Sequence, residues 1–219
     1  MTTNRAVVTA ADLYNAGMKM ELPDILAALR EATTSRHAVL DQGMPLAQDA
    51  PTLDHYRAHL TLLRHWLAPI EAWQARFTDG PQDPALLPPS PHIPLIDADL
   101  TDPLLPGAPI AMATPPAWFA DDSAAYRWGV AYVIEGSRLG GTVLYRRLAD
   151  RLAPHPLRYL HGDGVPPGPR WQQFLRVLRD QVQSPAAIAA ACAGACDAFD
   201  SLIALRDEYA ATPAAKVAA

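Results

Sequence analysis

One stretch of the sequence, residues 128–147 (WGVAYVIEGSRLGGTVLYRR), reads as a single long helix although it contains four glycines. A glycine inside a helix costs about 0.8–1 kcal/mol relative to alanine, so the four together give up roughly 3–4 kcal/mol. At about 100° per residue, Gly129, Gly136 and Gly140 fall within roughly 40° of one another. The fold must recover this energy, and we expect something to lie close against the bare backbone.

Spacing alone leaves two interpretations of this glycine strip open. Small residues on one face often mark a close crossing of two helices. The same bare backbone could instead form a lid over a planar ligand. The rest of the helix divides into apolar neighbours of the glycines (Tyr132, Val133, Leu139 and Val143), a second apolar arc (Val130, Ile134 and Leu148) and a side expected to face water (Ala131, Glu135, Arg138, Thr142 and Arg146).

Composition narrows the class of protein. With 219 residues, of which 50% are hydrophobic and 19% charged, the chain can bury a sizeable core. The formal charge of −5, without any basic run, argues against a nucleic-acid partner. No stretch of 18 or more apolar residues is present, so we expect no membrane span and a cytoplasmic location. Cys192 and Cys196 lie one helical turn apart, as packing residues or as a weak metal pair.

The hydrophobic periods and the Gly and Pro positions predict helices throughout, joined by loops. No strict alternation of strand length occurs, so the predicted fold class is all-α. The expected helices cover about residues 24–42, 53–77, 95–100, 128–147, 170–183 and 185–210, with Ser184 as the N-cap of the last one. Pro69 is expected to kink or divide the second helix.

Half of the prolines are concentrated in one segment, since 11 of the 22 fall between Pro81 and Pro116. Residues 79–122 are either a linker between two domains or a long loop wrapped on one domain. Their apolar content favours the loop. We therefore expect a loosely ordered arm at residues 1–22, a single helical domain at residues 23–210 and a tail at residues 211–219.

The predicted helix at residues 24–42 carries a histidine on its apolar stripe. His37 shares this stripe with Leu26, Leu29, Thr33 and Leu40, and such a histidine is usually a core residue. However, Asp41 lies four residues later, where a carboxylate can orient a metal-bound imidazole. Arg30 lies two turns earlier, a position that suits an anionic ligand. A second spacing, His55 and His59, could hold a metal, but no nearby acid completes that site.

These residues resemble motifs of the heme oxygenase family, particularly its bacterial branch that accompanies phytochrome photoreceptors. Residues 29–37 (LREATTSRH) are similar to the family's proximal helix, and residues 132–141 (YVIEGSRLGG) to its distal helix, whose glycines lie over the heme. Weaker similarity covers residues 94–100 (PLIDADL) and residues 170–176 (RWQQFLR).

The resemblance implies a single-domain helical bundle with the ligand between a proximal and a distal helix. It implies oxidative ring opening of heme to biliverdin, with release of CO and ferrous iron, so that heme is both substrate and cofactor. The implied partners are heme, an external electron donor such as a ferredoxin or flavin reductase, and a bacteriophytochrome that receives biliverdin. The implied site residues are His37 (axial iron ligand), Asp41 (its supporting carboxylate), Gly136, Ser137 and Gly140 (catalytic), and Arg30, Thr33, Tyr132, Val133, Gly136, Gly140 and Arg176 (heme-contacting).

The sequence departs from the family at one position. Ser137 stands where many members have an aspartate that orders water at the oxygen site. A hydroxyl is a weak acid, so we expect water to be the proton source. Two alternatives therefore stay open: a non-catalytic heme-binding or heme-storage protein, and a similar helical enzyme that acts on another small ligand.

Overall fold

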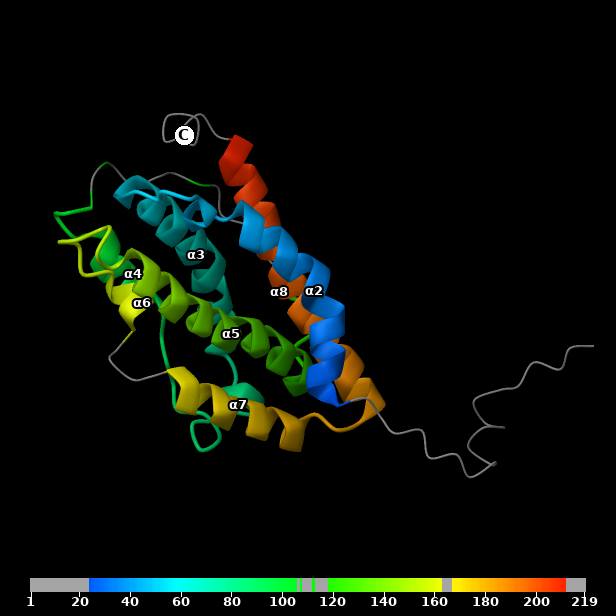
Figure 1. Cartoon of the computed structure of the whole chain (residues 1–219). Coiled ribbons are helices and arrows are strands. Elements are labelled where there is room, and N and C mark those ends of the chain that lie inside the picture. Colours follow the sequence, from blue (N-terminus) through cyan, green and yellow to red (C-terminus); the bar gives the residue numbers. More distant parts are fainter. Residues whose placement is uncertain (1–23, 106, 108–111, 113–117, 163–166, 212–219) are drawn as a thin grey trace, which may run out of the picture.

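The computed structural model describes residues 24–105, 107, 112, 118–162 and 167–211, and these residues form helices and loops without any strand. The all-α prediction is therefore confirmed for the described part of the chain (Figure 1). The elements are α2 (Ile25–Gly43), η1 (Pro45–Ala47), α3 (Leu53–Gln74), η2 (Gly80–Gln82), α4 (Ile93–Leu100), α5 (Ala124–Leu148), α6 (Arg158–His161), α7 (Pro167–Gln181) and α8 (Pro185–Ala211). The arm predicted at residues 1–22 and the tail from residue 212 lie outside the described residues.

Polar side chains begin three of the long helices. Thr52 starts α3 with a reciprocal capping box, because its hydroxyl accepts from the His55 N–H while the His55 ring contacts the Thr52 N–H. Ser123 caps α5 through the N–H of Tyr126. Ser184 accepts from the N–H of Ala187 at 3.1 Å, which confirms the predicted start of α8.

Pro69 does not divide α3, so that part of the prediction is wrong. The helix is continuous from Leu53 to Gln74 with Pro69 inside it. Leu67 and Ile70, on either side of the proline, are both fully buried. Packing of the flanking turns against the core holds the helix together across the missing hydrogen bond.

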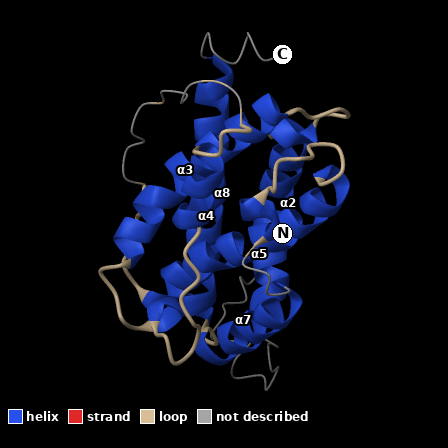
Figure 2. Cartoon of the chain, turned by 90° about the vertical axis from the view of Figure 1, so that its left-hand side faces the viewer, coloured by secondary structure: helices blue, strands red, loops and turns tan. Residues whose placement is uncertain are grey.

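Helix α8 contacts α2, α3 and α5, and Figure 2 shows that these elements are helices joined by loops. Its crossing with α5 is very close. A Cβ added at Gly129 of α5 would lie 1.8 Å from the carbonyl oxygen of Ala191, and a Cβ added at Gly194 of α8 would lie 2.2 Å from that of Tyr126. The helix-packing interpretation is therefore correct for Gly129.

The side of α5 that was expected to face water is partly buried. Ala131 and Glu135 are 7% and 9% exposed. Glu135 receives two hydrogen bonds from Arg170 of α7, at 2.6 and 2.8 Å, and this ion pair covers that side of the helix. The predicted apolar arc of Val130, Ile134 and Leu148 is buried, as expected.

The described residues of the proline-rich segment pack onto the core. Ile96 and Leu105 are buried, and Trp118 packs against the buried cluster. Asp97 of α4 accepts a 2.6 Å hydrogen bond from Arg64, and Asp99 accepts one of the same length from Tyr56. Both contacts join α4 to α3, as a loop wrapped on the core requires.

Among the described helices, α8 is long and apolar enough to cross a membrane by length and composition alone. Core helices pass the same test, and the apolar residues of α8, such as Leu202 and Leu205, are buried in this fold.

The α5–α8 crossing generates a prediction about two glycines of one helix. Gly129→Ala should lower the free energy of unfolding by about 1–3 kcal/mol, because the methyl group must displace the backbone of α8. Gly140→Ala should leave the stability unchanged or raise it by up to about 1 kcal/mol, because a Cβ there meets nothing within 4 Å and alanine favours the helix. Urea denaturation of the ligand-free protein measures both; equal effects at the two positions would contradict the assignment.

Candidate functional site

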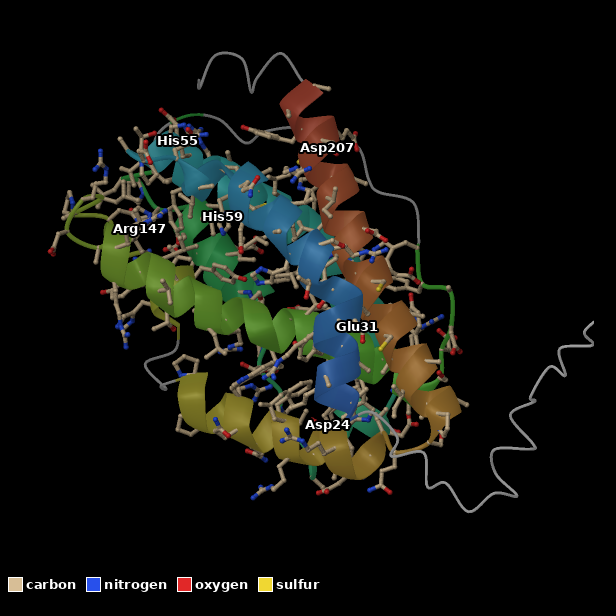
Figure 3. All side chains as sticks on the ribbon, turned by 45° about the vertical axis from the view of Figure 1, so that its right-hand side comes forward. Asp24, Glu31, His55, His59, Arg147 and Asp207 are labelled. Carbon is tan, nitrogen blue, oxygen red and sulfur yellow. The ribbon has the colours of Figure 1, made fainter. Side chains whose placement is uncertain are left out.

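Two contacts tie α2 and the turn that follows it to α5. One lies in the first half of α2, and the other lies just beyond its last residue. At one end the Arg30 side chain of α2 lies beside the hydroxyl of Tyr132 of α5. Burial raises the pKa of Tyr132, and the nearby Arg30 guanidinium partly opposes that shift. At the other end Arg147 of α5 donates to the carbonyl oxygen of Leu46, just beyond α2. Between these ties the two helices diverge (Figures 1 and 3).

His37 lies on α2 between the two ties, and its side chain is 63% exposed. The interpretation of His37 as a core histidine is therefore wrong. Its Nδ1 lies 2.8 Å from Oδ2 of Asp41, which is the contact that the sequence predicts. A carboxylate only accepts hydrogen bonds, so Nδ1 carries a proton, and the neutral form of the ring has its lone pair at Nε2. The ring can therefore offer Nε2 to a metal ion.

The sequence does not indicate what supports the His37 ring. Phe199 of α8 is nearly fully buried, and its ring centroid lies 5.9 Å from that of His37 at an interplanar angle of 57°. This contact restricts the ring on one side. The apolar pattern of α8 could have predicted that Phe199 is buried, but not which residue of α2 it meets.

Two glycines of α5 between the two ties, Gly136 and Gly140, are open. A Cβ at Gly140 would meet nothing within 4 Å, and one at Gly136 would meet only Trp171, at 3.8 Å. Val143, on the same face, is 65% exposed. This part of the glycine strip therefore lies against no helix backbone of the described chain, in contrast to Gly129.

Trp171 of α7 forms a wall beside this open strip, and the sequence analysis did not single it out. Its ring centroid lies 5.7 Å from that of Tyr132, and it stacks on Phe174 at 5.5 Å with an interplanar angle of 13°. The neighbouring Arg170–Glu135 ion pair holds this turn of α7 against α5. The sequence shows an aromatic residue in a short amphipathic helix, but it does not show where α7 lies relative to α5.

Four further predicted site residues have no described hydrogen bond or ion pair with His37, Asp41, Arg30 or Tyr132. Thr33 and Val133 are buried, and the Thr33 hydroxyl donates to the Leu29 carbonyl at 2.7 Å. Ser137 is exposed, and its hydroxyl donates to the Ile134 carbonyl at 2.7 Å. Arg176 is exposed on α7 and forms no ion pair with the described residues. The structure therefore brings together His37 with Asp41 and Arg30 with Tyr132, but gives Arg176 no contact with either pair.

Comparison with known proteins gives one partial match. Over 92 residues the chain is 46% identical to a protein named "Heme oxygenase" from Xanthomonas campestris pv. campestris (strain 8004). The match covers 41% of this chain and 53% of that relative, so the chain spans about half the relative's length. No family model matches the sequence. No solved structure matches it either. The match supports similarity to heme oxygenases.

The spacing of His55 and His59 does not produce a metal site in the described chain. The ring of His55 belongs to the cap of α3, whereas His59 is 7% exposed and its Nδ1 has no hydrogen-bond partner in the described chain. No group of three or more His, Cys, Asp or Glu side chains in the described residues could hold a metal ion. The cysteines pack as expected, since both are half-buried and Cys196 donates to the Ala32 carbonyl at 3.5 Å.

Burial of His59 predicts a pH-dependent stability. Burial lowers the pKa of His59 to about 4, from an ordinary value of 6.5. As the pH falls, His59 is therefore protonated first in the unfolded chain. The free energy of unfolding should fall as the pH drops from about 6.5 to 4. For this one group the decrease is at most about 1.4 kcal/mol per pH unit. His59→Leu should flatten that decrease, and His65→Gln should not. Urea denaturation between pH 7 and about pH 5 measures the slopes; an unchanged slope in His59→Leu would contradict the assignment.

Proposed function

We propose that this protein is a heme oxygenase that opens the heme ring to biliverdin and releases CO and ferrous iron. One observation carries the proposal: an exposed imidazole and a strip of bare backbone lie on two helices that are tied together at both ends. Heme is a flat, largely apolar disc with carboxylates at one edge. It requires an imidazole on one face, a close approach on the other and cations at the rim.

The residues fit heme at both faces. His37 would offer Nε2 to iron, because Nδ1 donates its N–H to the Asp41 carboxylate. On the other side, the missing side chain at Gly140 leaves a space that any Cβ would enter. The partial match to a heme oxygenase supports the same ligand. When bound, heme would supply both the iron at which dioxygen reacts and the ring that is opened.

The contribution of the chain is positioning. His37 would bind the iron, and the Asp41 carboxylate and the Phe199 ring would fix the direction of the imidazole. The backbone at Gly136 and Gly140 would limit the space above the disc and exclude bulk water from it. Trp171 would stop the disc at the edge of the strip near Gly136.

Proton supply in this proposal comes from water. The Ser137 hydroxyl uses its proton in the bond to the Ile134 carbonyl, so it can accept a hydrogen bond from a water molecule but is a weak acid itself. Ser137 is therefore proposed as a residue that orders a single water molecule, for which Gly136 and Gly140 leave room beside the ligand.

The rim of the disc carries two carboxylates, for which we propose Arg30 and Arg176. Arg30 lies beside Tyr132 at one tie of the site, so it is held near the edge of the strip. Arg176 is exposed and forms no ion pair with the described residues, which leaves its guanidinium available. Thr33 and Val133 would contribute the apolar floor near this edge.

Ring opening consumes electrons, so we propose an external donor such as a ferredoxin or a flavin reductase. We also propose a cytoplasmic location and a bacteriophytochrome as a recipient of biliverdin, following the resemblance of residues 29–37 and residues 132–141 to the phytochrome-associated branch.

A heme titration followed by reduction tests the proposal. Ferric heme should give a Soret band shifted from that of free heme, and ascorbate or a reductase should then convert it to the biliverdin spectrum. His37→Ala should shift the Soret band and lose turnover, whereas His65→Ala, a half-buried histidine of α3, should behave like the wild type. Heme binding without ring opening would indicate a storage protein. No Soret shift would indicate a helical enzyme that acts on another ligand.

A second experiment tests the glycine strip. Gly140→Val should abolish turnover because its side chain occupies the space beside the ligand, while the melting temperature of the ligand-free protein stays the same or rises slightly. Ala204→Val, at an exposed position of α8, is the matched control and should retain turnover. A Gly140→Val protein that unfolds easily yet remains active would show that this glycine serves packing instead.

A further inference from the structure

A small cavity lies behind α5, on the side away from the open glycine strip. Its volume is about 40 Å³, and its lining residues come from the start of α4, α5, α6 and the start of α7. A cavity needs a volume of about 10–15 Å³ to hold one buried water molecule, so this cavity has room for roughly three water-sized atoms. Ser137, Arg138, Gly141 and Thr142 form its α5 side.

The cavity contains one cation that has no carboxylate partner among the described residues. Arg138 donates to the Ser90 hydroxyl, which leaves most of the N–H groups of its guanidinium without a described acceptor. Two described acidic side chains, Glu71 and Glu135, accept hydrogen bonds from other groups. Glu71 accepts the N–H of His92 at 2.8 Å, and Glu135 pairs with Arg170.

The remaining polar groups of the cavity are neutral donors. His92 is 6% exposed, and burial, with the Arg138 and Arg170 charges, lowers its pKa to about 3. Its ring is therefore uncharged at pH 7 and has one N–H. Burial also raises the pKa of Tyr159, so its hydroxyl stays protonated. That hydroxyl lies 3.5 Å from Nδ1 of His92, at the long limit of a hydrogen bond.

A partly enclosed volume with a half-buried guanidinium, a phenol and an imidazole, and with no carboxylate among its described lining residues, suits a negative ligand. The guanidinium fork matches two oxygen atoms of one planar anion, and the phenol and imidazole can donate to the others. We propose that this cavity is a binding site for a small planar oxyanion of the size of formate or bicarbonate, with Arg138 as its charge partner and Tyr159 and His92 as donors. Apart from Ser137, the α5 residues of the lining (Arg138, Gly141 and Thr142) lie on the other side of the helix from Gly136 and Gly140, so the cavity does not overlap the strip proposed for heme.

Formate titration of the ligand-free, full-length protein tests the proposal. The melting temperature should rise with sodium formate in a saturable way, at an ionic strength held constant with sodium chloride. Arg138→Gln should weaken this response at least about tenfold, as expected for the loss of a charge-assisted contact. Arg146→Gln, which removes an exposed cation of the same helix outside the cavity, is the matched control and should respond like the wild type.

Two further variants keep the test decisive if Arg138→Gln does not fold. Arg138→Lys keeps the charge but loses the fork, and Tyr159→Phe removes one donor without changing the ring; each should weaken the formate response by several-fold. A response that does not saturate, or that is the same in the wild type and in every folded cavity variant, would overturn the proposal and indicate a general salt effect.

Discussion

The close crossing of α5 and α8 is the contact on which the rest of the structure depends. Gly129 passes over the carbonyl of Ala191, and Gly194 over that of Tyr126, so each backbone occupies the space that a side chain of the other helix would fill. Helix α8 also contacts α2, and the ion pair of Arg36 on α2 with Asp200 on α8 joins the two helices. The positions of α2 and α5 are therefore set largely through a third helix, and the two need to touch each other only at their ties.

This indirect support explains how a stable protein can keep an open strip. Gly136 and Gly140 together give up roughly 2 kcal/mol of helix propensity, and no packing contact in the described chain returns it. Gly129 gives up about 1 kcal/mol, but the close approach of α8 recovers it. Exposed Val143 and exposed His37 lie in the same region. A fold that leaves such residues uncovered is consistent with a surface reserved for a ligand.

The opposite face of α5 is organised by a buried carboxylate. Asp99 of α4 is fully buried and accepts hydrogen bonds from the Tyr56 hydroxyl at 2.6 Å and from the backbone N–H of Tyr159 at 2.8 Å. Without these donors, a buried carboxylate would be strongly unfavourable. With them, it fixes the short helix α6 against α3 and α4. Tyr159 is thereby held beside Arg138. Helix α5 therefore presents a bare apolar face to one environment and a polar face to another.

The sequence by itself determined what depends on neighbours within a few turns: the all-α class, most helix bounds, the Ser184 cap and the contact between His37 and Asp41. These follow from helical periodicity, which relates residues three and four positions apart. Only the tertiary structure decided which glycines are packed and which are open, because Gly129 and Gly140 share one face and differ only in whether α8 crosses it. Likewise, Glu135 is buried because α7 lies against it, and His37 is exposed because no helix of the described chain covers it. Such contacts join residues far apart in the chain, and local spacing carries no information about them.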